Sequence, residues 1–295
     1  MPGNVTGVTK AADVTAAAAG TISLAGDLEV RRMGYGAMRI TGEGIWGEPP
    51  DGEAAKRVLR RALELGVNFI DTADSYGPDV SERLIAEALH PYPDDLVIAT
   101  KGGLVRSGPG GWEPDGRPVH LREACEGSLR RLRLDRIDLY QLHRPDPNVP
   151  FEESVGAIAE LRAEGKIRHA GLSNVTAEQV DRAREIVPVV SIQNRYSVAE
   201  RDSDPLVDLC QREGLAFIPW WPLVAGRIAE RGGPLERARG AHGATAAQVA
   251  LAWLLHRSPA ILPIPGTGSV AHLEENVAAA GLRLSDDEYD SLAAA

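Results

Sequence analysis

The sequence predicts an α/β fold in which parallel strands close into a (β/α)8 TIM barrel, with an N-terminal β-hairpin closing its bottom. Short apolar runs alternate with longer stretches of helical periodicity from residue 33 onward. Repeated strand–helix units of this kind produce a parallel sheet. Eight strand-like runs occur in the chain, which favours a closed barrel over an open sheet. Three of these runs end on ionisable side chains, as expected where the carboxyl ends of barrel strands converge.

The first elements precede the main alternation. Residues 21–30 alternate between apolar and polar side chains around a Gly-Asp turn, which predicts a β-hairpin. Residues 33–38 predict the first barrel strand. We expect residues 1–20 to be a disordered tail. Residues 21–295 are then a single barrel domain.

The remaining strands and helices follow in strict alternation. Ala54, Val58, Ala62 and Leu65 recur at helical spacing on one face, and a glycine follows them as a stop signal. The later strands are predicted at residues 67–70, 96–100, 137–142, 167–172, 189–192, 215–219 and 261–264. Helices are predicted at residues 53–65, 80–89, 121–132, 152–163, 177–186, 206–213 and 245–256, with a further helix opening after residue 269 and a last one around residue 286.

Composition excludes several classes of protein. A chain of 295 residues with 43% hydrophobic residues can form one barrel with a large core. The formal net charge of −10 argues against nucleic acid or an anionic membrane as a partner. No run is long enough to span a membrane, and the Ala-rich start lacks the features of a signal peptide. Oligomeric state leaves no trace in the sequence.

The cysteines and histidines indicate neither disulfides nor a metal. Cys125 and Cys210 are far apart, lie in predicted helices and read as buried thiols, which points to a reducing cytoplasm. The seven histidines are scattered without ligand spacing, so no metal site is expected.

Three loops on the carboxyl side of the strands are expected to build the walls of a site. Residues 102–119 are rich in Gly and Pro, residues 144–150 hold three prolines, and residues 222–244 are rich in Gly and Arg. Loops in this position carry function in barrels, so we expect substrate walls and a cofactor clasp. The alternative for residues 102–119 is a floppy insertion.

The strand ends carry groups suited to proton transfer. Asp71 and Tyr76 follow one strand, Lys101 ends the next, and His143 follows a third. A phenol has a pKa near ~10, and a neighbouring ammonium lowers it by favouring the phenolate. Tyr76 is therefore the candidate acid, Lys101 the charge beside it and Asp71 the partner of Lys101. His143 can hydrogen-bond a substrate oxygen. Considered singly, each residue also has a non-catalytic alternative: Tyr76 as a wall residue, Lys101 as a solvated side chain and His143 as a structural residue.

These stretches resemble the aldo-keto reductase family. The matching runs are FIDTADSYG around Asp71 and Tyr76, IATKGG around Lys101, and DLYQLHRPD around His143. They occur in the family's order, and the resemblance extends from about residue 33 to the C-terminus. It implies a (β/α)8 barrel and the NAD(P)H-dependent reduction of an aldehyde or ketone, with Asp71, Tyr76, Lys101 and His143 as catalytic residues.

The resemblance also implies a cofactor site along the second half of the chain. Ser173, Asn174 and Gln193 match positions that hold the nicotinamide carboxamide, and Trp220 matches the aromatic residue that stacks on the ring. Trp221 stands where the family commonly has Ser. Core packing is the alternative for both tryptophans. The full set of cofactor-binding residues is Ala37, Met38, Asp71, Ser173, Asn174, Gln193, Trp220, Trp221, Pro222, Leu223, Gly266, Thr267, Gly268, His272, Glu275 and Asn276.

The phosphate-binding end of this site departs from the family. Backbone N–H groups at the N-terminus of a helix bind phosphate, and Gly266, Thr267 and Gly268 lead into such a helix. Many family members carry Lys or Arg at Gly266, Gly268 or His272, whereas here only His272 can carry charge, with Arg227 as a further cation. We expect NADPH as the cofactor, with NADH as the alternative.

Several stretches are similar to the bacterial pyridoxal reductase branch of the family. They surround Tyr35, Trp46, Trp220 and Gly266. This similarity implies reduction of pyridoxal to pyridoxine. Trp46, Trp112 and Trp221 are aromatic residues at the expected mouth that can sandwich a flat pyridine ring, so Trp46 and Trp112 are expected to contact the substrate. A general aldehyde reductase of secondary metabolism is the alternative enzyme, and a non-catalytic cofactor-sensing subunit is the alternative from another class.

Overall fold

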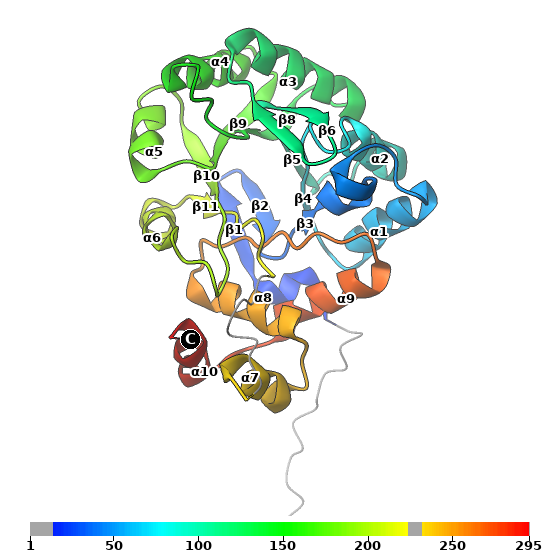
Figure 1. Ribbon diagram of the computed structural model, residues 1–295, viewed down its shortest axis with the longest axis vertical. Helices are drawn as coiled ribbons and strands as arrows, with labels where there is room; N and C mark the ends of the chain where they lie inside the picture. The colour runs from blue at the N-terminus through cyan, green and yellow to red at the C-terminus, as the bar shows by residue number, and fades with distance from the viewer. Residues whose placement is uncertain (1–13, 224–231, 295) are drawn as a thin grey trace, which may run out of the picture.

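A curled parallel sheet occupies the centre of the computed structural model, which describes residues 14–223 and 232–294. Helices surround the sheet (Figure 1). Its strands lie in the order β11-β10-β9-β8-β5-β4-β3, and every hydrogen-bonded pair is parallel. The strands are β3 (Tyr35–Gly36), β4 (Phe69–Asp71), β5 (Val97–Gly102), β8 (Ile137–Leu142), β9 (Ile167–Ser173), β10 (Val189–Gln193) and β11 (Ala216–Phe217). The predicted parallel α/β architecture is therefore present.

The predicted strand at residues 261–264 lies between the two ends of this sheet. It makes one isolated β-bridge, between Ile261 and Phe217. Leu262 N donates to Phe217 O at 2.9 Å, and on the other side Gly34 N donates to Pro263 O at 2.9 Å. Proline lacks an N–H, and Pro263 lies within this short segment with Pro265 directly after it, so a regular ladder is interrupted.

The helices follow the alternation expected from the sequence. Thr176, Thr245 and Ser285 each form a capping box that satisfies free N–H groups in the first turn. The helices are α1 (Gly52–Glu64), α2 (Val80–Leu89), α3 (Pro118–Leu132), α4 (Phe151–Ala163), α5 (Ala177–Arg184), α6 (Asp204–Glu213), α7 (Pro234–His242), α8 (Ala246–Arg257), α9 (Val270–Ala278) and α10 (Asp286–Ala293), with 3-10 turns η2 (Ala16–Ala19), η3 (Ala37–Ile40), η4 (Glu43–Ile45) and η6 (Ala279–Gly281).

An antiparallel pair, β1 (Thr21–Leu24) and β2 (Leu28–Arg31), stands before the parallel sheet. It crosses the middle of the curled sheet in the view of Figure 1. Leu24, Leu28 and Val30 are buried in one apolar cluster with side chains from the parallel strands. Asn68 ties the pair to the start of β4, because its side chain donates to Glu29 O at 3.0 Å and accepts from Arg31 N at 2.8 Å.

The structure corrects several boundaries. The tail predicted to reach residue 20 was wrong for residues 14–20, because η2 (Ala16–Ala19) packs there: Ala16 is buried and its N–H donates to Leu65 O. Residues 1–13 lie outside the described residues. The first strand ends at Gly36, so Ala37 and Met38 belong to η3 instead.

The loop at residues 102–119 is a second antiparallel hairpin, β6 (Leu104–Gly108) and β7 (Gly111–Pro114), not a floppy insertion. Most of its side chains are only partly buried, so no apolar alternation marked it in the sequence. The loop at residues 222–244 contains α7. Arg227 falls within residues 224–231, which lie outside the described residues.

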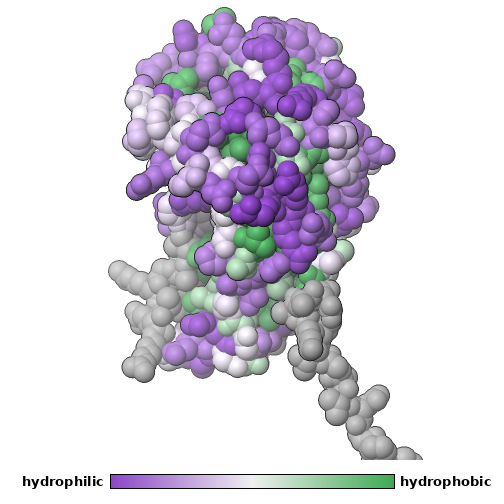
Figure 2. Space-filling model, turned by 90° about the vertical axis from the view of Figure 1, so that its right-hand side faces the viewer, coloured by the Kyte–Doolittle hydropathy of each residue, from purple (hydrophilic) through white to green (hydrophobic). Residues whose placement is uncertain are grey.

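The surface is predominantly hydrophilic on the face shown in Figure 2, where hydrophobic residues occur in small groups. Among residues 14–223 and 232–294, none of the helices combines the length and the apolar character that crossing a membrane requires. Within the same ranges, no three His, Cys, Asp or Glu side chains gather as a metal site.

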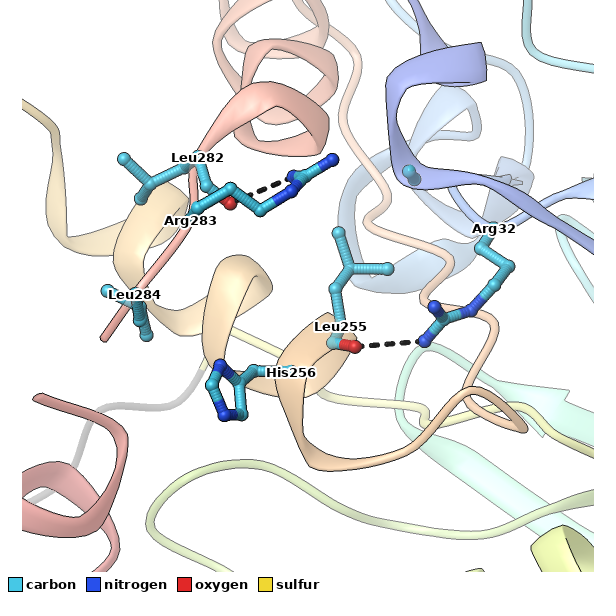
Figure 3. Close-up of a pocket in the computed structure, with 7 residues that line it drawn as sticks. Arg32, Leu255, His256, Leu282, Arg283 and Leu284 are labelled. Carbon is cyan, nitrogen blue, oxygen red and sulfur yellow. Dashed lines mark hydrogen bonds between the residues drawn. The ribbon is translucent and has the colours of Figure 1, made fainter. Parts of the chain in front are cut away.

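A small cavity of about 210 Å³ lies between α8, η6 and the chain after β2, and two arginines line it. Figure 3 shows Arg32 and Arg283 directed at backbone carbonyls around this space. Arg32 donates to Leu255 O at 3.0 Å, to Ile261 O at 3.1 Å and to Ser258 O at 2.5 Å. These bonds hold the end of α8 against the chain that leads into β3. Burial, with the nearby charge of Arg283, lowers the Arg32 pKa to about 10.

We predict that Arg32→Met destabilises the protein. The substitution keeps the apolar stem but leaves three carbonyls without a charged donor, so the free energy of unfolding should fall by about 2 kcal/mol. Urea denaturation measures the loss. Arg57→Met is the matched control, since the Arg57 side chain is 58% exposed and pairs only with an exposed carboxylate. Equal stability of the two variants would contradict a bracing role for Arg32.

Candidate active site

Three neighbouring strands deliver the predicted catalytic residues to one place. Asp71 is the last residue of β4, and the turn that follows returns Tyr76 toward the strand. Lys101 lies near the end of β5, and His143 directly follows β8. All four side chains are buried, with exposed fractions from 0% for Lys101 to 7% for Tyr76 and His143. The order β4-β5-β8 in the sheet explains why residues so far apart in sequence meet.

Lys101 is the hub of this cluster. Its Nζ donates to Asp71 Oδ2 at 2.6 Å, to Thr72 O at 2.8 Å and to Tyr76 Oη at 3.2 Å. An ammonium has three N–H donors, so each of them has an acceptor. The pairing that the sequence suggested between Asp71, Lys101 and Tyr76 is therefore present as geometry.

Two glutamines complete the surroundings of Asp71. Gln193 Nε2 donates to Asp71 Oδ1 at 2.8 Å, and Gln141 Nε2 donates to the same oxygen at 3.2 Å. Together with Lys101 they leave both carboxylate oxygens hydrogen-bonded, which is what a buried charge requires. Gln141 was not predicted as a site residue. Its position as a polar residue between Tyr140 and Leu142, two residues before His143, was a usable signal.

The pKa of Tyr76 shifts in the opposite direction to the one expected from Lys101 alone. Burial raises it, and the charge of Lys101 only partly offsets that effect, so the net direction is upward. For Lys101, burial lowers the pKa, but Asp71 and Tyr76 outweigh it and the pKa is raised. At neutral pH the pair is a protonated phenol beside an ammonium. Tyr76 therefore holds a proton that it can donate.

His143 lies close to the phenol. The ring centroids of Tyr76 and His143 are 5.8 Å apart at an interplanar angle of 81°. Burial, with the charges of Lys101 and Arg144, holds the His143 pKa well below its usual value, so the imidazole is neutral at pH 7. Its Nδ1 lies 3.4 Å from Ser75 Oγ. A neutral imidazole can hydrogen-bond a carbonyl oxygen without adding charge to the cluster.

A cavity of about 550 Å³ opens above these residues. Predicted site residues provide most of its lining: Met38, Asp71, Tyr76, Trp112, His143, Ser173, Asn174, Gln193, Trp220, Trp221, Pro222, Leu223 and Gly266. Further lining comes from residues that were not predicted: Gly36, Arg39, Ile45, Leu104, Arg144 and Ile264. Ser173 and Asn174 are fixed at its floor, since Ser173 Oγ donates to Gln193 O at 2.8 Å and Asn174 Nδ2 donates to His143 O at 2.9 Å.

Other predicted residues lie away from the lining. Ala37 and Asn276 are buried, Thr267 is 9% exposed, and Gly268 and His272 are on the surface near the start of α9. Glu275 accepts a hydrogen bond from Thr245 Oγ1 at 2.5 Å, so its carboxylate already has one partner on α8. Trp46 is 36% exposed and does not line the cavity, which differs from the substrate contact expected for it.

The shape and chemistry of the cavity suit a dinucleotide. Gly36 and Gly266 approach so closely that a Cβ on either would lie 2.7 Å from a backbone oxygen, so only glycine fits there. This leaves bare backbone at the mouth, next to the N-terminus of α9, where free N–H groups favour an anion. Within the described residues, the buried Trp220 Nε1 has no hydrogen-bond partner, although its ring lines the cavity. The residues present therefore fit a flat ring at one end and phosphate groups at the other.

Two cationic residues that line the cavity, Arg39 and Arg144, were not predicted as site residues. Arg39 lines the cavity and lies beside the glycine loop, since a Cβ on Gly266 would be 3.7 Å from Arg39 Cγ and one on Gly268 would be 3.1 Å from Arg39 O. Arg144 follows His143 directly and is exposed. Both follow predicted site residues in sequence, but side-chain direction after a strand depends on the local turn, which the pattern does not reveal.

The match to a family model defines the class of protein. The model of the Aldo/keto reductase family matches residues 32–295, and the chain belongs to this family. The similarity also extends to individual relatives. The chain is 51% identical over 279 residues to an uncharacterized oxidoreductase of Schizosaccharomyces pombe, covering 95% of this chain and 90% of the relative.

A second relative carries a specific name. The chain is 46% identical over 273 residues to a pyridoxine 4-dehydrogenase of Escherichia coli, covering 90% of this chain and 95% of that protein. Among solved structures, it is similar to an aldo/keto reductase from Klebsiella pneumoniae in complex with NADP and acetate. The TM-score is 0.78 at 29% identity, and the match covers 92% of this chain and 93% of the other.

We predict that Lys101→Met costs about 3–5 kcal/mol of stability, because it leaves the Asp71 carboxylate buried without its cation. The double variant Asp71→Asn/Lys101→Met should lose much less, since it removes both charges together. Thermal or urea unfolding of the single and double variants tests this. The exposed pair of Arg83 and Glu87 provides a control, for which Arg83→Met should cost under ~1 kcal/mol. If the double variant is as unstable as Lys101→Met, the unpaired Asp71 carboxylate is not the cause of the lost stability.

Proposed function

We propose that this protein is an NADPH-dependent carbonyl reductase in which Tyr76 donates the proton. The observation that carries the proposal is the buried cluster in which Lys101 Nζ lies 2.6 Å from Asp71 and 3.2 Å from Tyr76, with the phenol facing the cavity. Reduction of a carbonyl needs a hydride at carbon and a proton at oxygen. A reduced nicotinamide, when bound, supplies the hydride.

The chain's own residues account for the proton. A substrate oxygen held between Tyr76 and His143 receives the phenolic proton and a hydrogen bond from the neutral imidazole. As the proton leaves, negative charge develops on Tyr76 Oη, and the adjacent Lys101 ammonium stabilises it. Asp71 keeps Lys101 charged and in place. General acid catalysis of this kind contributes typically ~10²–10⁴-fold to the rate.

The remaining lining residues are suited to hold the cofactor. Trp220 presents its ring to a nicotinamide, and Ser173, Asn174 and Gln193 present polar groups to its carboxamide. The glycine loop and the start of α9 take the phosphates, with Arg39 as the cation beside them. Since the Klebsiella pneumoniae structure was solved with NADP, we favour NADPH over NADH, and His272 at the exposed start of α9 is the group available to a 2′-phosphate.

The proposed substrate is pyridoxal, reduced to pyridoxine. Support comes from the Escherichia coli relative named pyridoxine 4-dehydrogenase, at 46% identity over nearly the whole chain. The cavity is consistent with a flat ring, because Trp112 lies edge-on to both Tyr76 and His143. A general aldehyde reductase is the second candidate. The relatives are named as oxidoreductases, which disfavours a non-catalytic cofactor-sensing subunit.

Three wider expectations accompany this function. Residues 261–264, bonded to both ends of the curled sheet, are proposed as the eighth strand of a closed (β/α)8 barrel. The β1–β2 hairpin, with its apolar residues in the same cluster as the strand interiors, is proposed to close the bottom. Cys125 and Cys210 are free and buried, which accords with the proposed cytoplasmic location of a single-domain enzyme.

We predict that the protein oxidises NADPH in the presence of pyridoxal, and that Tyr76→Phe removes most of this activity because it deletes the phenolic proton that the proposed step transfers. Loss of general acid catalysis should lower kcat by about 10²-fold or more. NADPH binding, followed by quenching of Trp fluorescence, should persist. A kcat near the wild-type value in Tyr76→Phe would rule out Tyr76 as the general acid. Ready reduction of 4-nitrobenzaldehyde without reduction of pyridoxal would replace the specific substrate by a general aldehyde reductase.

We predict that Arg39 and His272 affect cofactor use differently. Arg39 lies beside the glycine loop, so Arg39→Gln should raise KM for NADPH and NADH alike, by about tenfold. His272→Ala should lower only the preference for NADPH, the ratio of the two kcat/KM values, because NADH lacks the 2′-phosphate. Both are measured at constant salt, since the contacts are ionic. A change in the ratio with Arg39→Gln and none with His272→Ala would exchange the two roles.

A further inference from the structure

Arg106 lies on the β6–β7 hairpin, beside the substrate end of the cavity, and every N–H of its guanidinium group meets a backbone carbonyl. Nε donates to Gly111 O at 2.9 Å. Nη1 donates to Ile45 O at 2.7 Å and to Ser75 O at 3.2 Å. Nη2 donates to Gly44 O at 3.0 Å and to Gly108 O at 3.2 Å. A guanidinium has no further donor, so this group is fully committed.

These carbonyls belong to three separate parts of the site. Gly108 and Gly111 flank the turn of the hairpin itself. Gly44 and Ile45 are in η4, after the first parallel strand, and Ser75 is in the turn between Asp71 and Tyr76. One side chain therefore fastens the hairpin to the catalytic turn and to the loop after β3.

The loop that Arg106 grips has an unfavourable backbone conformation. Gly44 has φ +65° and Ile45 has φ +59°. A left-handed conformation is costly for a β-branched residue and persists only where its surroundings enforce it. Arg106 donates to the carbonyls of both residues, of which Ile45 is the strained one, and Ile45 in turn lines the cavity. The hydrogen bonds from Arg106 therefore stabilise Ile45 in a backbone conformation that it would otherwise rarely adopt, and so keep its side chain in the cavity wall.

The same guanidinium stacks on tryptophan. Its Cζ lies 3.7 Å from the centroid of Trp112 and 5.6 Å from that of Trp46. Attraction between a guanidinium and an indole ring is worth about 0.5–2 kcal/mol. Trp112 is then presented edge-on to the reacting groups, with its ring centroid 6.3 Å from that of Tyr76 and 6.5 Å from that of His143. Trp46 therefore serves the cavity indirectly, through Arg106.

We propose that Arg106 is a positioning residue that assembles the substrate-binding wall formed by Ile45, Leu104 and Trp112, and so determines selectivity for flat aromatic carbonyl substrates. The inference rests on the proposed function. Arg106 touches neither substrate nor cofactor in this role. It acts through the three wall residues, which line the cavity beside Tyr76 and His143. An aromatic substrate needs this wall, whereas a small aliphatic aldehyde reaches Tyr76 without it.

Lysine cannot replace Arg106. An ammonium has three donors at a single point and cannot reach acceptors spread over three chain segments, nor stack as a plane on Trp112. Arg106→Lys and Arg106→Gln should therefore behave alike, which a role depending on charge alone would not produce. Arg117→Gln is the matched control, because Arg117 lies next to the hairpin but bonds only to Asp115 and is 64% exposed.

Steady-state kinetics with two aldehydes tests the proposal. Arg106→Gln should raise KM for pyridoxal or 4-nitrobenzaldehyde by about tenfold, the equivalent of ~1.4 kcal/mol. KM and kcat for propanal, and the Kd of NADPH, should stay within about twofold. Trp112→Ala should also raise KM for the aromatic aldehyde, and adding it to Arg106→Gln should raise that KM little further, since both act on one wall. Unchanged kinetics, or equal damage to both aldehydes and to NADPH binding, would overturn the assignment.

Hydrogen exchange separates this proposal from the proposed function. Amide exchange across residues 104–114 and 43–47 should become faster in Arg106→Gln and Arg106→Lys, but not in Arg117→Gln, whether or not any aldehyde is reduced. If wild-type protein reduces none of the aldehydes while exchange responds as expected, the enzymatic function fails and the anchoring stands. If exchange in both segments is unchanged in the Arg106 variants, the anchoring itself is wrong.

Discussion

The buried ion pair between Lys101 and Asp71 is the constraint on which the rest of the site depends. Two charges taken out of water cost several kcal/mol each unless they meet each other and satisfy their remaining hydrogen bonds. Here the ammonium has three acceptors, and both oxygens of the carboxylate have donors. That requirement fixes the relative position of β4 and β5. It also fixes the turn that carries Tyr76, because Thr72 O and Tyr76 Oη are two of the acceptors.

The electrostatics of Tyr76 follow from the same arrangement. Lys101 favours the phenolate, yet burial favours the neutral phenol more strongly, so the pKa rises. A phenol whose pKa is raised stays protonated at neutral pH, so it carries the proton that the proposed reduction needs. In the proposed reaction, the charge that develops on Tyr76 as its proton leaves is stabilised by a cation already in place, so no rearrangement is required at that moment. Burial therefore keeps the phenol protonated, and the ion pair holds a cation beside its oxygen.

The walls around this cluster are held by a second kind of interaction. The guanidinium groups of Arg106 and Arg32 bond to backbone carbonyls, the first beside the active-site cavity and the second at the C-terminal end of α8. Arginine suits this task because its donors are fixed in a plane and spread over several ångströms. Arginines that bond to backbone carbonyls in this way are difficult to predict from sequence. Neither arginine alternates with apolar residues or belongs to a recognisable motif of charges.

The sequence by itself determined the alternation of strands and helices, the parallel sheet and the identity of the residues at the ends of β4, β5 and β8. Those features depend on local periodicity, on glycines that end helices and on which side chain follows an apolar run. Each of these is a pattern within a short contiguous stretch of sequence. The tertiary structure decided the raised pKa of Tyr76, the hairpin within residues 104–114, the ordered segment at residues 14–20 and the place of Trp46. Each of these depends on burial or on contacts between residues far apart in the chain, which the order of residues does not measure.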